Sequence, residues 1–184
     1  MSPAVWLLVA VVVLVALAVI VSRNRFVRQA ALVGESWGDI DVELSRRHDL
    51  IPNLVETVKG YATHERQVLE LLVQAREQAA THRGDPPAAR EGYEETLTRA
   101  LDSVLARAEG YPDLKASTNF LDLQRQLTLT EDRIAAARRF YNGNVRSYNT
   151  RVRTFPSNVI ASMFGFEPKD FFELKDASAP VTPG

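Results

Sequence analysis

The 184-residue chain contains no cysteine, so disulfides, cysteine zinc sites and thiol nucleophiles are all excluded. An excess of charge of one sign is also missing, because 22 Lys and Arg residues stand against 23 Asp and Glu residues. Nucleic-acid-binding proteins usually carry a basic excess on one face. We therefore expect no nucleic-acid partner.

Motifs for catalysis or metal binding are missing as well. The histidines are His48, His64 and His82, and His64-Glu65 lacks the second histidine that a zinc-protease motif requires four residues after the first. The sequence has no glycine-rich phosphate loop and no serine in a nucleophile turn. We expect no enzymatic activity, no catalytic residue, no metal and no cofactor. Carboxylates on the predicted helices are interpreted as parts of solvated faces: Glu94, Glu95, Glu131 and Asp132.

A long hydrophobic run is present near the N-terminus. Eighteen apolar residues extend from Ala4 to Val21 without a charge, a proline or a glycine. A helix of this length covers about 27 Å, close to the ~30 Å hydrocarbon core of a bilayer. We predict a single transmembrane helix over residues 4–22. The alternative is a cleaved secretory signal ending near Ala16-Leu17-Ala18, but no Lys or Arg precedes the run, and it is longer than a signal core.

The charges beside the run predict its orientation. Arg23, Arg25 and Arg28 follow it, whereas residues 1–3 carry no charged side chain. Positive residues favour the cytoplasmic side, so we expect residues 1–3 to be a short extracytoplasmic tail. Residues 23–172 then form a cytoplasmic bundle. Residues 173–184, rich in Ala, Ser and Pro, are predicted to be a disordered tail.

Apolar residues after the anchor recur at alternating spacings of three and four, as in a coiled coil. We predict one helix from Trp37 to about Ala79, kinked at Pro52, whose ring crowds the carbonyl of His48. A second stripe, which includes Ala62 and Leu69, widens the apolar face. The main stripe consists of Trp37, Ile40, Leu44, Ile51, Leu54, Val58, Tyr61, Val68, Leu72, Ala75 and Ala79.

Turn signals divide the rest of the chain. Gly84 suits a helix C-cap, Asp85 an N-cap and Pro86 the first position of a second helix, which ends at Gly110. An extended stretch over residues 111–118 leads to a third helix, which ends before Pro156.

The periodic spacing predicts an all-α fold, an elongated antiparallel up-and-down bundle of three long helices and a short C-terminal one, and the helix lengths predict its topology. The first helix measures about 68 Å and the second about 35 Å, and the extended stretch adds about 26 Å. The third helix is therefore expected to begin near the membrane-proximal end of the first and to end at the far tip.

A charged cluster before Pro52 contains Arg47, which occupies a position on the apolar stripe. A buried arginine needs a partner, because an unpaired desolvated charge is very costly. A carboxylate of the third helix, such as Asp122, is the expected partner. We interpret the cluster as an internal ion pair that fixes helix register; the alternative is a partner-binding groove. Its candidate residues are Arg46, Arg47, His48, Asp49, Pro52 and Asn53.

Aromatic residues gather after Pro156. Ser157 suits the N-cap of a short helix with one apolar face, and we expect this helix to close the bundle with Phe164 and Phe166 packed inside. The alternative is a docking segment for another protein or for lipid, and the predicted place at the far tip weakens the lipid version. The candidate segment consists of Met163, Phe164, Phe166, Phe171 and Phe172.

Four motifs carry a resemblance to a known family. They resemble motifs of the LemA family. The four motifs are the run from Arg46 to Val58, Tyr111-Pro112-Asp113-Leu114-Lys115-Ala116, the block from Glu131 to Tyr148, and Phe155-Pro156-Ser157-Asn158 with Phe164-Gly165-Phe166. The resemblance implies a helical bundle anchored in the inner membrane of a bacterial cell. One branch of the family takes part in forming magnetosome membranes. The resemblance implies no catalytic residue for this chain, since none is agreed for the family.

The leading functional prediction is a non-enzymatic, membrane-anchored scaffold or adaptor that presents a rigid bundle to protein partners. The alternative is an oligomeric protein that shapes the bilayer. Besides the lipid bilayer, the resemblance implies an HtpX-type membrane protease or a TPM-domain protein as a partner. A homo-oligomer formed through the long helices is also expected.

Overall fold

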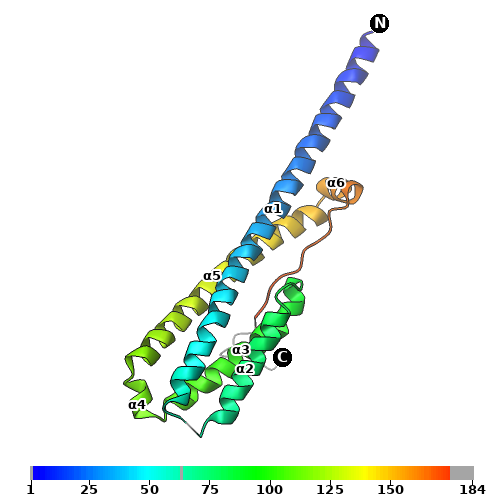
Figure 1. Ribbon diagram of the computed structural model, residues 1–184. Helices are drawn as coiled ribbons and strands as arrows, with labels where there is room; N and C mark the ends of the chain where they lie inside the picture. Colours follow the sequence, from blue (N-terminus) through cyan, green and yellow to red (C-terminus); the bar gives the residue numbers. More distant parts are fainter. Residues whose placement is uncertain (1, 63, 175–184) are drawn as a thin grey trace, which may run out of the picture. The chain divides into compact units, whose positions relative to one another are not determined.

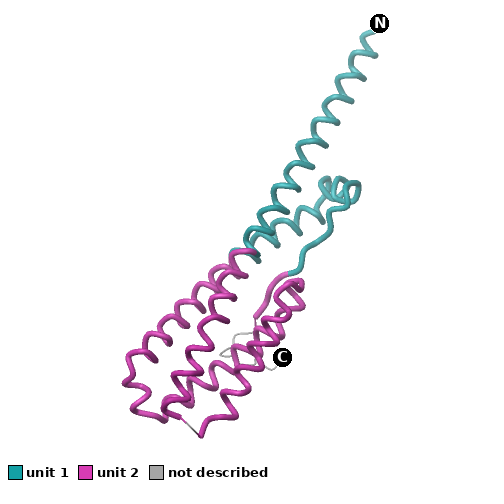
Figure 2. The backbone as a smooth tube through the Cα atoms, in the orientation of Figure 1, with its two compact units in different colours: residues 1–37, 140–170 teal, residues 38–139, 171–184 magenta. Residues whose placement is uncertain are grey.

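The computed structural model describes residues 2–62 and 64–174, so the predicted tail over 173–184 lies outside the described residues from 175 onward. Six helices occur in the described part: α1 (Pro3–Lys59), α2 (Arg66–Thr81), α3 (Pro87–Ala108), α4 (Pro112–Lys115), α5 (Thr118–Arg153) and α6 (Ser157–Phe164) (Figure 1). No strand occurs there, so the all-α prediction is confirmed. The chain forms two compact units, unit 1 with residues 1–37 and 140–170, and unit 2 with residues 38–139 and 171–184 (Figure 2).

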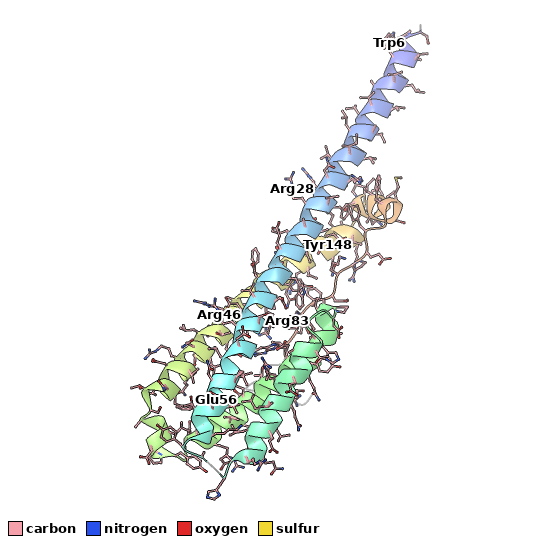
Figure 3. All side chains as sticks on the ribbon, in the orientation of Figure 1. Trp6, Arg28, Arg46, Glu56, Arg83 and Tyr148 are labelled. Carbon is pink, nitrogen blue, oxygen red and sulfur yellow. The ribbon has the colours of Figure 1, made fainter. Side chains whose placement is uncertain are left out.

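The apolar run forms the first part of α1. Helix α1 is long and apolar enough to cross a membrane, and no part of its most apolar 18-residue stretch is buried. Trp6 is 62 % exposed and Leu7 is 69 % exposed. Figure 3 shows Trp6 near the free N-terminal end of this helix. Such exposure of large apolar side chains fits a lipid environment.

The predicted helix from Trp37 to Ala79 is wrong, because α1 ends at Lys59 and α2 begins at Arg66. Gly60 follows the last residue of α1, and glycine has a low helix propensity. The turn also changes which residues are buried. Tyr61 is 48 % exposed, whereas Ala62 and Leu69, which belong to the second stripe, are each 2 % exposed. The break therefore lets α2 fold back and bury the second stripe.

Helix α1 continues through Pro52, and α2 compensates for the proline. Proline has no N–H, so it leaves the carbonyl of His48 without its usual bond inside the helix. Arg76 of α2 donates from Nε to this carbonyl oxygen at 3.3 Å. The backbone bond that Pro52 removes is thus replaced by a side chain from the neighbouring helix.

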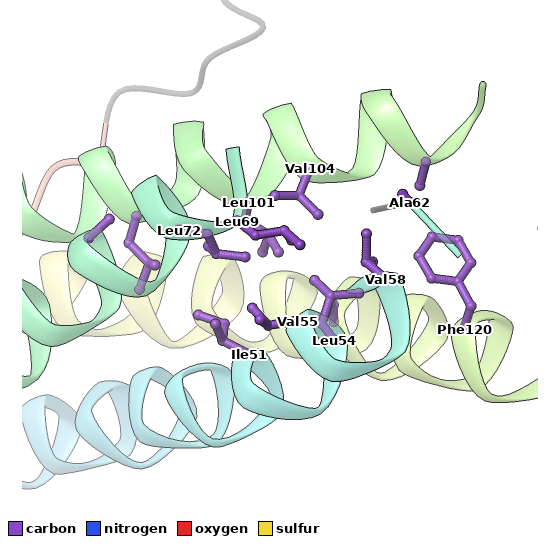
Figure 4. Close-up of a cluster of buried hydrophobic side chains, with 14 of the residues drawn as sticks. Ile51, Leu54, Val55, Val58, Ala62, Leu69, Leu72, Leu101, Val104 and Phe120 are labelled. Atoms are coloured by element: carbon purple, nitrogen blue, oxygen red, sulfur yellow. The ribbon is translucent and has the colours of Figure 1, made fainter. Parts of the chain in front are cut away.

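Unit 2 is an up-and-down bundle built from the end of α1, from α2 and α3, and from the beginning of α5 (Figures 1 and 2). Successive helices run in opposite directions, as the connections require. The core brings together Ile51 and Leu54 of α1, Leu72 of α2 and Leu101 of α3 (Figure 4). Phe120, at the start of α5, lies at one end of this cluster.

Four local predictions need correction. Gly84 and Ser157 are not caps, because His82 is the C-cap of α2 and Pro156 is the N-cap of α6. Residues 111–118 were expected to be extended, but Pro112–Lys115 forms the short helix α4, with Leu114 fully buried in the core. The second predicted helix begins one residue later than expected, with Pro86 at the N-cap and Pro87 as the first helical residue, so Asp85 does not cap it. Consecutive prolines suit both positions, which explains the shift.

The expected direction of the third long helix is wrong. Because α1 and α2 are two helices rather than one, the chain reverses once more, and α5 runs antiparallel to α1 in each unit. In unit 2, Arg47 contacts Glu131 and Glu43 contacts Arg133. In unit 1, the rings of Trp37 and Tyr141 lie 5.4 Å apart, and those of Phe26 and Tyr148 lie 6.1 Å apart. The end of α5 therefore lies beside the residues that follow the apolar run, not at a far tip.

After α6, the chain returns along α5 within unit 1. Gly165 ends α6 with φ 70°, a left-handed conformation that favours glycine. Asn149 of α5 then holds the backbone of Lys169 twice, donating from Nδ2 to its carbonyl oxygen and accepting from its N–H at Oδ1, both at 2.8 Å. Tyr141 donates its hydroxyl to the carbonyl oxygen of Asp170 at 2.8 Å.

We expect Arg76→Met to lower the free energy of unfolding by about 1 kcal/mol, the usual net value of a hydrogen bond, because the carbonyl of His48 loses its donor. In a Pro52→Ala background, which restores the helical N–H, the same substitution should cost less than about 0.5 kcal/mol. Denaturant unfolding in detergent of the wild type, Arg76→Met, Pro52→Ala and the double variant measures both values. Equal costs in the two backgrounds would show that Arg76 does not compensate for Pro52.

Candidate functional site: a buried arginine and glutamate network

Arg47 lies on the buried face of α1. Leu44 precedes it on the apolar stripe and Ile51 follows it, and these two residues are at most 1 % exposed. Arg47 itself is 0 % exposed, so its guanidinium is held inside unit 2. A charge in this position is stabilised only by partners that reach it from other helices.

Three side chains from two helices accept hydrogen bonds from Arg47. Its Nη2 donates to Oε2 of Glu94 on α3 at 2.7 Å. Its Nη1 donates to Oε1 of Glu131 on α5 at 2.6 Å and to Oγ1 of Thr98 on α3 at 2.9 Å. One guanidinium therefore joins α1, α3 and α5, and its rigid planar geometry defines how the three helices are aligned.

Glu94 is the central acceptor of the network. It is 1 % exposed, and its Oε2 lies 3.3 Å from Nε2 of His48 as well as next to Arg47. On the same carboxylate, Oε1 lies 3.6 Å from Nη2 of Arg90, which is also 1 % exposed. Arg90 further donates from Nη1 to Oδ1 of Asp41 at 2.8 Å.

The Arg90 side chain also holds a loop. Its Nη1 donates to the carbonyl oxygen of Arg83 at 2.9 Å, in the turn between α2 and α3. The same guanidinium therefore connects α1, through Asp41, with α3 and with the turn that precedes it. Two buried arginines thus act on one carboxylate and connect four segments of unit 2, namely α1, α3, α5 and the turn between α2 and α3.

The electrostatics of the pair favour the charged forms. Burial alone would raise the pKa of Glu94, but the hydrogen bond from His48 and the positive charge of Arg47 outweigh it, so the pKa lies below its usual value. Burial alone would lower the pKa of Arg47, but the charges of Glu131 and Glu94 more than offset it and raise the pKa. Both groups therefore stay ionised at neutral pH.

The structure divides the predicted cluster into two sets. Arg47 and His48 are buried, while Arg46, Asp49, Pro52 and Asn53 are exposed. Arg46 is near Glu43 of its own helix, at 3.8 Å, and takes no part in the buried network (Figure 3). The prediction that Asp122 pairs with Arg47 is wrong. Asp122 pairs with Arg125 three residues later on α5, whereas Glu131 of the same helix and Glu94 of α3 bind Arg47.

The interpretation of Glu94 and Glu131 as solvated is also wrong. Glu94 is fully enclosed, and Glu131 is partly buried against Arg47. The sequence contains a signal for the first of these, because Arg90 and Glu94 continue the spacing of the buried stripe on α3. That stripe consists of Arg90, Glu94, Leu97, Leu101, Val104 and Ala108. Charged residues on an apolar stripe of each of two helices indicate a buried ion pair.

The candidate docking segment is divided between the two units. Phe172 is fully buried in unit 2 and Phe171 is half-buried. In unit 1, Phe166 stacks on Phe26 at 4.8 Å. Phe164 is 41 % exposed and Met163 is 64 % exposed, so the expected packing of Phe164 into a core is wrong. Phe164 is the last residue of α6, and its ring lies 5.4 Å from the guanidinium of Arg23.

The network is an internal set of ion pairs that connects α1, α3 and α5. Within residues 2–62 and 64–174, no three His, Asp or Glu side chains are grouped so that they could hold a metal ion. Arg47, Arg90 and Glu94 are closed off from solvent, and Glu131 and Asp41 supply the further negative charge that the two guanidinium groups need. We expect their arrangement to fix the register of α1 against α3 and α5, because displacing any of these helices by a turn would separate buried charges.

Comparison with known proteins gives one family and several relatives. The model of the LemA family matches residues 36–183. The chain is 27 % identical over 143 residues to Protein LemA of Metamycoplasma hominis, which covers 76 % of this chain and 63 % of the relative. It is 24 % identical over 178 residues to Magnetosome protein MamQ 2 of Paramagnetospirillum magneticum, with 84 % of this chain and 65 % of the relative covered. The chain thus spans less than two thirds of the length of these relatives.

Arg47→Ala is expected to lower the free energy of unfolding by about 3–5 kcal/mol, because Glu94 keeps a buried charge and loses its main partner. The matched control is Arg46→Ala on the adjacent, exposed position, which should change stability by less than about 0.5 kcal/mol. Denaturant unfolding of the full chain in detergent measures both. Similar effects of the two substitutions would contradict the assignment of Arg47 as a buried, paired charge.

Protonation of Glu94 in acid should also lower the free energy of unfolding. The pKa of Glu94 is lower in the folded than in the unfolded state. The contribution of the carboxylate to the free energy of unfolding is therefore complete above the unfolded-state pKa of about 4.3, and it is lost as the pH falls through the folded-state pKa. Glu94→Gln should therefore lose more stability at neutral pH than in strong acid. Thermal unfolding followed by circular dichroism from neutral to acid pH tests this, with Glu95→Gln as control. A difference from wild type that does not shrink in acid would contradict it.

Proposed function

Because the chain belongs to the LemA family, we propose that it is a membrane-anchored helical scaffold that presents the bundle of unit 2 to protein partners and has no enzymatic activity. The proposed membrane is the inner membrane of a bacterial cell. The proposed orientation places the N-terminus outside and the bundle in the cytoplasm, which Arg23, Arg25 and Arg28 support through the positive-inside rule.

The observation that best supports this proposal is that one helix, α1, has an exposed apolar part and a part that belongs to the interior of unit 2. The first part of α1 exposes its apolar side chains, with Leu8 64 % exposed. The last part of the same uninterrupted helix contributes Arg47, Ile51 and Leu54 to the interior of unit 2. A chain built this way connects a lipid-facing segment covalently to a bundle whose helix register is fixed by buried charge.

The surface of unit 2 offers a site for a partner to bind. An open recess of about 520 Å³ lies between the end of α1 and α2. It is lined by apolar side chains such as Val55 and Leu69 and by charged ones such as Lys59 and Arg66. Apolar side chains together with charged ones are typical of protein interfaces. An HtpX-type protease or a TPM-domain protein is a candidate partner by family resemblance.

An oligomeric, membrane-shaping protein is the second candidate function. Two observations favour it: the relatives named as magnetosome proteins, and the exposed apolar residues of α6 next to the anchor in unit 1, such as Met163. A protein that shapes the bilayer would contact lipid and further copies of itself rather than a different protein.

A photo-crosslinking amino acid at Gln74, which lines the recess, distinguishes the two functions. In intact cells the scaffold account expects one discrete adduct with a different protein that is cytoplasmic or resides in the inner membrane, identified by mass spectrometry. The matched control is the exposed Gln124 on α5, which should give no such adduct.

Adducts only between copies of the chain, together with a change in vesicle diameter when the purified protein is reconstituted, would favour the membrane-shaping function. An adduct with an extracytoplasmic protein would overturn the proposed orientation.

A further inference from the structure

Helix α6 exposes an apolar face. Val159 and Met163 lie four residues apart and therefore on one side of the helix, and they are 51 % and 64 % exposed. Ala161, two residues from each of them and therefore on the opposite side, is buried, and Phe164 at the end of α6 is 41 % exposed. An amphipathic helix with this pattern needs an occupant for its apolar face, since exposed clusters of large apolar residues mark interaction surfaces.

The position of α6 within unit 1 identifies that occupant. The guanidinium of Arg23 lies 5.4 Å from the ring centre of Phe164, and Phe166 stacks on Phe26. Ser157, at the start of α6, lines an open recess of about 510 Å³ together with Ala18 and Val21, at the end of the apolar run. The end of α6 therefore contacts the part of α1 in which the apolar run gives way to charged residues, and the start of α6 borders a recess beside the same part.

The depth of these contacts matches the bilayer interface. Arg23 lies about 3 Å along the helix axis beyond Val21, and Phe26 lies about 7.5 Å beyond it. The headgroup layer on each side of the hydrocarbon core is roughly 5–7 Å thick. If the apolar run spans the core, Phe164 lies within this layer. Aromatic and apolar side chains at this depth are typical of helices that lie in the membrane surface.

The charge of unit 1 specifies the kind of lipid. Although the whole chain is almost neutral, residues 1–37 and 140–170 carry seven Lys and Arg against three Asp and Glu. The basic residues are Arg23, Arg25, Arg28, Arg146, Arg151, Arg153 and Lys169. Basic residues next to a membrane segment bind anionic headgroups. Unit 2 has the opposite balance, 15 basic against 20 acidic residues.

We propose that α6 is an interfacial helix that lies in the headgroup layer of an anionic membrane surface, with Val159 and Met163 directed to the acyl chains and Phe164 beside Arg23 in the headgroup layer. The proposal rests on the membrane anchoring of α1 proposed above. It gives the chain a second lipid contact, which holds unit 1 against the bilayer at the point where α1 leaves it.

Because the chain has no cysteine, a single introduced cysteine can be labelled without first replacing any native cysteine. The experiment uses the full chain reconstituted in phosphatidylcholine vesicles, with and without phosphatidylglycerol, and a fluorophore at one of three positions. Met163→Cys probes the proposed interface, Leu8→Cys the anchor, and Gln124→Cys an exposed position of unit 2. Lipids brominated at defined depths quench a fluorophore that reaches them.

We expect the Met163 label to be quenched most strongly by bromines near the headgroup end of the acyl chains, and more strongly in vesicles with phosphatidylglycerol. The Leu8 label should be quenched by deep bromines and the Gln124 label by none. Quenching at Leu8 without quenching at Met163 overturns the interfacial helix and leaves the anchor intact, as expected if a protein or a second copy covers α6. No quenching at Leu8 overturns the anchor itself, and equal quenching at Met163 in both vesicle types overturns the anionic preference.

Discussion

The buried pair of Arg47 and Glu94 is the interaction on which the rest of unit 2 depends. Both side chains are at most 1 % exposed and lie 2.7 Å apart, and each binds further charged groups. Apolar contacts between helices tolerate a shift along the helix, whereas two buried charges stabilise the fold only in one alignment. The pair therefore specifies the arrangement that the surrounding Leu, Ile and Val side chains stabilise.

Part of this structure could be predicted from the sequence. The exposed apolar part of α1 follows from the composition of residues 4–21 alone, and the all-α class follows from the periodic spacing. The helix break at Gly60 could not be predicted, because the spacing continues almost unchanged and only shifts by one position, from Tyr61 to Ala62. That single break reverses the direction of α5, and therefore changes the expected location of α6.

The partners of Arg47 were difficult to predict for a related reason. Which carboxylate reaches a buried arginine depends on the direction and register of the other helices, and an error in one turn changes both. Glu131 reaches Arg47 from α5, which runs antiparallel to α1 in unit 2. Periodicity identifies a buried residue, but only the complete topology identifies its partner.

A double-mutant cycle between Arg47 and Glu94 tests the account most directly. The substitutions Arg47→Met and Glu94→Met, singly and together, are followed by denaturant unfolding of the full chain in detergent. The account predicts that each single substitution costs about 3–5 kcal/mol and that the double substitution costs at least about 2 kcal/mol less than the sum, because neither charge is left buried alone. Costs that add without coupling would contradict the claim that this pair aligns the helices.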